Sequence, residues 1–161
     1  MTAIIRLIDS INRGILILLG VLLGIMSVII IFQIFSRFFL GLPLSWSEEL
    51  ARIIMAYAVF MGAGLALRHQ QMIAVEFLAE RLPRQKRRIL KMIIHVVAII
   101  FFVLLLVKGL DMMEKVHTQR LAALQLPMSV AYASIPVGSV LLIMNAITVL
   151  LEMFSKKEGE M

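Results

Sequence analysis

Three ionisable residues, Glu48, Glu49 and Arg52, stand at the start of a long apolar stretch of the sequence. Glu48 and Arg52 are four positions apart, the spacing at which side chains meet on one face of a helix, so we expect them to form an ion pair. Ionisable groups near a bilayer are costly and usually face protein, water or each other. We therefore expect these residues to face a protein partner, water or each other.

Two other sets of residues have side chains that can do chemistry. His95 is the one ionisable residue of the apolar stretch 92–107, and an imidazole there can relay protons or bond to an adjacent helix. Asp111, Glu114 and His117 carry metal-ligating groups, but successive three-residue steps drift around a helix and no fourth ligand follows. The chain has no cysteine, which excludes disulfides and thiolate sites. We expect no metal, no cofactor and no enzymatic activity.

The composition places these residues in an integral membrane protein. Of the 161 residues, 61% are hydrophobic and only 16% are charged, and the mean hydropathy is +1.00. A soluble core of this size would leave too much of that apolar surface in water. The net charge of +6 comes from basic residues beside apolar stretches. Anionic lipid is therefore a better partner for them than nucleic acid.

Hydrophobic runs of roughly 20 residues match a hydrocarbon layer of about 30 Å at about 1.5 Å per residue. We predict an all-α fold, a single membrane domain over 1–161 with four transmembrane helices at about 14–40, 46–67, 89–110 and 128–154. Short amphipathic interfacial helices are predicted at about 3–13 and 71–82. Pro136 removes one backbone donor, so it should kink the last span or mark its true start near Ser134.

Small side chains recur on one face of the second span. Ala51, Ala58, Gly62 and Ala66 fall within about 60° of one another on a helix, a strip at which another helix can approach closely. In the first span, Gly20 and Gly24 form a G-x-x-x-G pattern of the same kind. We expect the strip on the second span to contact protein rather than lipid.

Basic residues are unevenly shared between the two sides of the predicted spans. The N-terminal segment, the 68–91 connection and the C-terminus hold 11 Lys and Arg, against 4 in the opposite connections. The cytoplasmic side of membrane proteins carries this excess, so both termini are predicted in the cytoplasm. Five of these residues form a cluster before the third span that we expect to face anionic lipid: Arg84, Lys86, Arg87, Arg88 and Lys91.

Four sequence patterns together resemble the small membrane subunit of TRAP transporters, the DctQ or SiaQ family. The patterns are W-S-E-E-L-A-R from Trp46, F-M-G-A from Phe60, A-L-R ending at Arg68 and I-A-V-E from Ile73. The last span resembles that of the family as well, with L-P-M at 126–128, Tyr132 and P-V-G at 136–138. The chain departs from the family pattern at Met72 and Glu76.

The resemblance implies a scaffold subunit of a sodium-driven importer of organic acids in the bacterial inner membrane. Its partners would be a large membrane subunit (DctM/SiaM-like) that holds the transport site and a periplasmic substrate-binding protein (DctP/SiaP-like). The alternatives are a stand-alone four-helix exporter, which would need an acidic residue in a central membrane position, and a structural partner in another membrane complex. The acids of this chain lie at the ends of the predicted spans.

Overall fold

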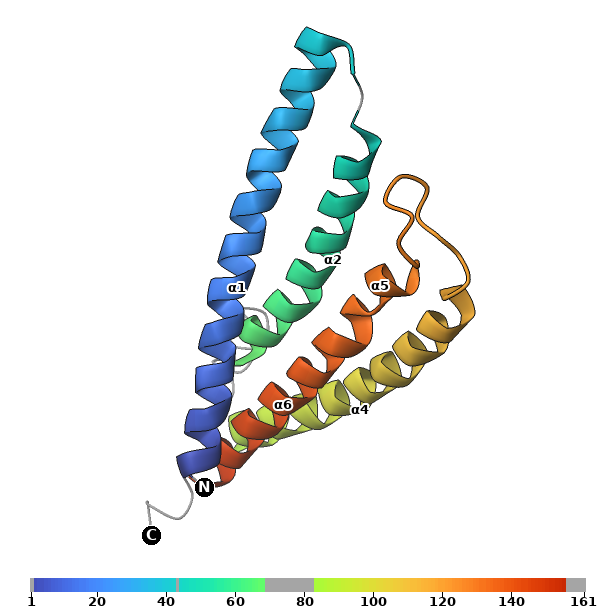
Figure 1. The fold of residues 1–161 in the computed structure, drawn as a ribbon. Coiled ribbons are helices and arrows are strands. Elements are labelled where there is room, and N and C mark those ends of the chain that lie inside the picture. Colours follow the sequence, from blue (N-terminus) through green and yellow to red (C-terminus); the bar gives the residue numbers. More distant parts are fainter. Residues whose placement is uncertain (1, 43, 69–82, 156–161) are drawn as a thin grey trace.

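The computed structural model describes residues 2–42, 44–68 and 83–155. Its elements are α1 (Thr2–Phe35), the π-helix η1 (Ser36–Leu40), α2 (Ser45–Arg68), α4 (Arg84–Val116), the short α5 (Ser129–Tyr132) and α6 (Ser134–Ser155). Figure 1 shows α1 and α2 as one antiparallel pair and α4 and α6 as another, the two pairs meeting where α1 begins and α6 ends and diverging toward the opposite end. We call the end at which α1 begins and α6 ends the terminal end. The opposite end, where α2 begins at Ser45, is the motif end.

The fold class and the number of spans are confirmed within the described residues. Four helices are long and apolar enough to cross a membrane: Ile5–Leu40, Ser45–Arg68, Ile89–Val116 and Ser129–Glu152. Residues 3–13 do not form a separate helix, because α1 runs unbroken from Thr2 to Phe35. Two residues of their polar face, Asp9 and Asn12, bond to side chains of α2 and α6, whereas the other two, Arg6 and Arg13, are exposed.

Glycine and proline set the boundaries of the elements. Gly41 has a φ of 65°, a left-handed conformation that suits glycine, and its N–H donates to the Ser36 carbonyl to close η1. Pro83 stands directly before the first residue of α4. The last span is interrupted at Ala133, between the end of α5 at Tyr132 and the start of α6 at Ser134. Pro136 lacks the N–H that would bond to the Tyr132 carbonyl, which explains the predicted start near Ser134.

Helix α6 is the centre of the packing. In the most apolar part of the last span, which contains α6, 56% of the residues are buried. The corresponding shares are 6% in the first span and 11% in the third. It packs along α2 and α4, and the α1 helix lies mainly against α2. A side chain on Gly138 would lie 3.0 Å from the backbone carbonyl carbon of Phe60 and closer still to its Cβ, so only glycine allows α2 and α6 to come this near.

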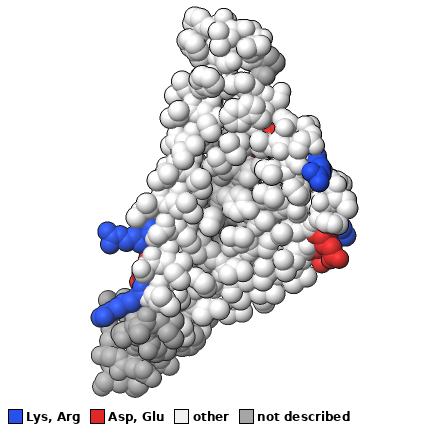
Figure 2. All heavy atoms as spheres, viewed as in Figure 1, with Lys and Arg blue, Asp and Glu red and all other residues white. Residues whose placement is uncertain are grey.

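Charge is absent from most of the protein surface drawn in Figure 2, where Lys, Arg, Asp and Glu stand at its edges around a broad uncharged face. The predicted basic cluster falls within the first eight residues of α4. The predicted interfacial helix at 71–82 lies outside the described residues.

Candidate functional site

Glu49 holds the connection between α4 and α5 against the start of α2. Its carboxylate oxygens accept hydrogen bonds from the backbone N–H groups of Ala123, at 3.0 and 3.1 Å, and of Leu124, at 2.8 Å. The connection is itself a compact turn, in which Leu121 donates to Leu126 at 2.9 Å and Gln125 has a φ of 55°. Charge-assisted bonds of this kind are stronger than neutral ones, so Glu49 fixes the loop over the motif end.

The predicted ion pair between Glu48 and Arg52 is wrong. Among the described residues Glu48 instead accepts a hydrogen bond from Gln33 of α1, with Nε2 2.8 Å from Oε1. An exposed pair four residues apart is worth only a few tenths of a kcal/mol, so a donor held in place by the neighbouring helix readily replaces it. Glu48 therefore joins α1 to α2, and Arg52 makes no hydrogen bond or ion pair within the part of the chain described.

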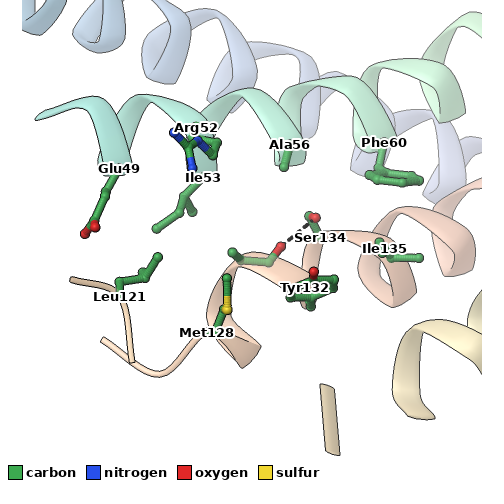
Figure 3. A pocket seen from close by; sticks show the side chains of 11 residues that line it. Glu49, Arg52, Ile53, Ala56, Phe60, Leu121, Met128, Tyr132, Ser134 and Ile135 are labelled. Atoms are coloured by element: carbon green, nitrogen blue, oxygen red, sulfur yellow. Dashed lines mark hydrogen bonds between the residues drawn. The ribbon is translucent and has the colours of Figure 1, made fainter. Parts of the chain in front are cut away.

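A cavity of about 360 Å³ lies beside these residues, between α2 and the start of the last span. Figure 3 shows Glu49 and Arg52 on α2 at one end of it, with Ile53, Ala56 and Phe60 continuing along the same helix. The opposite wall is formed by the turn and by α5 and α6, at Leu121, Met128, Ala131, Tyr132, Ser134 and Ile135. Trp46, one turn earlier in α2, is 41% exposed, as an interfacial anchor would be.

At the terminal end, Arg68 joins three helices. Its guanidinium donates from Nε to Asp9 of α1 at 2.8 Å, and from Nη1 and Nη2 to Glu152 of α6 at 2.9 and 2.7 Å. The arginine side chain is 12% exposed, whereas the two carboxylates are 48% and 31% exposed. The planar fork of a guanidinium suits such a double contact. Arg68 is thus a structural residue that clamps α1, α2 and α6 together.

A second polar contact lies deeper on the same three helices. Asn12 and Asn145 exchange hydrogen bonds, at 2.7 and 3.1 Å, and Asn145 also donates to the Gly64 carbonyl at 2.9 Å. Asn145 is fully buried and Asn12 is 5% exposed. Gly64 permits the approach, because a Cβ there would lie 2.9 Å from the Leu141 side chain. The contact fixes the depth at which the three helices meet.

The small-residue strip of α2 lines a groove shared with α1. Ala58, Gly62 and Ala66 form one wall, and the opposite wall contains Gly20 from the G-x-x-x-G pattern. The groove measures about 540 Å³, and a Cβ added to Gly62 or Gly20 would meet no atom within 4 Å. Ala51, the fourth residue of the strip, is half-buried nearer the motif end. The two small-residue patterns therefore face each other without closing the space between them.

His95 is buried, with 7% exposure, and its Nδ1–H donates to the Lys91 carbonyl of its own helix at 2.7 Å. Nδ1 of His95 therefore does not make the expected hydrogen bond to an adjacent helix. Nδ1 of His95 is thus a satisfied polar group.

Some of the residues that hold the site together were missed by the sequence reasoning. Asn145 carries a signal, since an amide in an apolar span seeks a partner, and Glu152 is an acid at the end of a span. Three glycines lie in tight contacts, Gly64, Gly109 and Gly138. No signal in the sequence distinguishes them, because the sequence also has Gly62 and Gly20 in open space.

The family described as tripartite ATP-independent periplasmic transporters, DctQ component, matches residues 26–156. The sialic acid TRAP transporter small permease protein SiaQ of Vibrio cholerae is 25% identical over 122 residues, 76% of this chain and 70% of the relative. The ectoine TRAP transporter small permease protein TeaB of Halomonas elongata is 31% identical over 130 residues, 78% of this chain and 65% of the relative. The sialic acid TRAP transporter permease protein SiaT of Haemophilus influenzae is 38% identical over 60 residues, 37% of this chain and 10% of the relative.

Proposed function

This chain belongs to the DctQ family, the small component of tripartite ATP-independent periplasmic transporters, and from that premise we propose that it is the scaffold subunit of a sodium-coupled importer of organic acids. Sialic acid and C4-dicarboxylates are the proposed substrates. The proposed partners are a large membrane subunit, which carries the transport site, and a periplasmic substrate-binding protein.

The observation that carries the proposal is the family match, which covers residues 26–156, from the later part of the first span to the end of the fourth. The 60 matched residues, 37% of this chain, make up only a tenth of the permease SiaT. In that relative the equivalent region is part of a much larger membrane protein, which supports a large permease as the partner here. Four membrane spans in this family place the chain in the inner membrane as a multi-pass protein.

The geometry favours a scaffold over a carrier. The buried hydroxyls of α6 are engaged by carbonyls of their own chain, as Ser139 is by Ile135 and Thr148 by Met144. The acids with bonds in the described residues lie toward the two ends of the helices: Glu48 and Glu49 at one, Asp9 and Glu152 at the other. A carrier or exporter would need a polar group open to its substrate near the membrane centre.

We further propose that the groove between α1 and α2 receives side chains of the large subunit. The groove is lined by small and aliphatic residues and has room for larger ones at Gly62. Replacing Ala58 and Gly62 with leucine should leave the chain folded and reduce its co-purification with the large subunit. Undiminished co-purification of the doubly substituted chain would place that interface on another face.

Reconstitution tests the transport assignment. Proteoliposomes with the small chain and a sodium gradient should take up no sialic acid or dicarboxylate, even with the binding protein added. Uptake should appear when the large subunit is included and should collapse when the sodium gradient is removed. Uptake by the small chain alone would favour the stand-alone carrier, and sodium-independent uptake by the complete assembly would refute the coupling.

A further inference from the structure

The cavity at the motif end has an apolar interior, and its rim carries one cation, Arg52, and one carboxylate, Glu49. Ile53, Ala56 and Phe60 of α2 line it along about two turns, and Ile135 of α6 faces them. Arg52 stands exposed where the row of apolar side chains begins (Figure 3). A cavity of about 360 Å³ with this lining offers an apolar chain a site out of the bulk lipid.

The guanidinium of Arg52 has N–H donors that make no hydrogen bond in the described residues. Glu48 is bonded to Gln33, and Glu49 is bonded to the backbone of the α4–α5 turn. Among the described residues no acceptor lies within hydrogen-bonding distance of the Arg52 guanidinium, which has five N–H donors. The Tyr132 hydroxyl, on the opposite wall, also makes no hydrogen bond in the described part of the chain. An arginine and a tyrosine that lack acceptors at a membrane helix end are suited to a phosphate oxygen.

We propose that this cavity binds a phospholipid as an integral component of the subunit. The phosphate accepts hydrogen bonds from the guanidinium of Arg52 and from the hydroxyl of Tyr132, and one acyl chain enters the space beside Ala56. The unbonded donors of Arg52 and Tyr132 select a headgroup that contains a phosphate, and the apolar lining selects a chain-bearing molecule over free phosphate. The bound lipid fills the gap between α2 and the last span. This inference stands on the cavity and its rim and does not depend on the transport assignment.

Native mass spectrometry of the purified full-length chain tests the proposal with phosphatidylglycerol as the probe. The Arg52→Gln variant should bind phosphatidylglycerol about tenfold more weakly, because it loses charge-assisted hydrogen bonds. Arg52→Lys should recover part of the affinity, and Tyr132→Phe should lose a smaller part. The matched control is Arg37→Gln, an exposed arginine at the same end in η1 that does not line the cavity. Its affinity should stay within twofold of the wild type.

A second arm tests the acyl chain. Ala56→Leu and Ala131→Leu narrow the cavity from opposite walls and should each weaken binding with Arg52 intact, while thermal unfolding shows that the variants are folded. Diacylglycerol, which lacks the phosphate, and glycerol 3-phosphate, which lacks the chains, should each compete poorly.

Several results would overturn the proposal. Equal losses in Arg37→Gln and Arg52→Gln would indicate a general surface attraction. Unchanged binding in both cavity-narrowing variants, or effective competition by glycerol 3-phosphate, would indicate an anion held at the rim alone. Loss of bound phosphatidylglycerol when the large subunit is added would assign the cavity to a protein segment instead.

Discussion

The two arginines of α2, Arg52 and Arg68, have different roles because their surroundings differ. Arg68 lies 12% exposed between two carboxylates, whereas Arg52 is exposed and meets none within bonding distance in the described residues. Desolvation makes the first contact matter for folding, since a buried charge without its counter-ion costs several kcal/mol. For Arg52 the same donors remain available to a ligand or to a partner.

Replacing Arg68 with methionine should therefore destabilise the chain. The substitution keeps an unbranched apolar side chain but leaves Asp9 and Glu152 without the cation that joins them. We expect a loss of about 2 kcal/mol in the free energy of unfolding, below the usual cost of breaking a buried pair because both carboxylates are partly exposed. Unfolding in detergent, measured by intrinsic fluorescence of the single tryptophan, gives the value.

A coupled variant separates the clamp from a general effect of charge. Arg68→Met combined with Glu152→Gln should cost less than the sum of the two single changes, because the second change removes a carboxylate that the first left unpaired. Strict additivity would contradict the clamp. Arg37→Met, at an exposed arginine of the other end, should leave stability nearly unchanged.

At the scale of the helices, glycine position decides which pairs can touch. Gly138 brings α6 against the backbone of α2, and Gly64 admits the Leu141 side chain of α6. Gly62, only two residues from Gly64, faces the open groove toward α1. Because α2 turns 100° per residue, two neighbouring glycines can serve opposite faces.

Gly138→Ala and Gly62→Ala form a matched pair. The added methyl at position 138 would overlap Phe60 and should force α2 and α6 apart, at a cost of about 1–3 kcal/mol. The same methyl at position 62 meets open space and should not lower the unfolding midpoint, since alanine is also the better helix former. The midpoints of thermal unfolding in one detergent, compared side by side, check this. Equal midpoints for the two variants would contradict the close packing of α2 on α6.

At the scale of the whole molecule, the four spans differ in how much of each the chain itself covers. The first span is 36 residues long, and only 6% of its most apolar part is buried. It measures about 54 Å against a hydrocarbon layer of about 30 Å, although Arg6, Asp9, Asn12 and Arg13 make its beginning polar. Tilt, a locally thicker bilayer or a covering partner accommodates such an excess. The Asp9–Arg68–Glu152 contact sets the beginning of α1 beside the ends of α2 and α6.

We predict that this terminal end faces the cytoplasm, from the excess of basic residues on its side. Single cysteines report sidedness cleanly, because the chain has none of its own. A cysteine at Gln119, in the α4–α5 connection, should react with an impermeant thiol reagent added to intact cells, and one at Gln85 should react only after permeabilisation. The reverse pattern of labelling would invert the orientation.

The sequence by itself determined the membrane class and the approximate spans. Composition and run length set these, since a segment of about 20 apolar residues has few alternatives to crossing a bilayer as a helix. The break before the last span was equally local, because Pro136 cannot donate to Tyr132 in any tertiary context. These features depend on neighbours in the chain, which the sequence lists directly.

Only the tertiary structure decided which polar groups meet. Spacing favoured Glu48 with Arg52, but Gln33 on α1 took Glu48, and Glu49 took the turn at Ala123, 74 residues away. Asp9 and Asn12, two polar residues of the segment 3–13, meet Arg68 and Asn145, both on other helices. Rotation and depth of each helix in the packed molecule select such partners, and a difference of one residue turns a side chain by 100°. That selection is a property of four helices together, and no single stretch of sequence contains it.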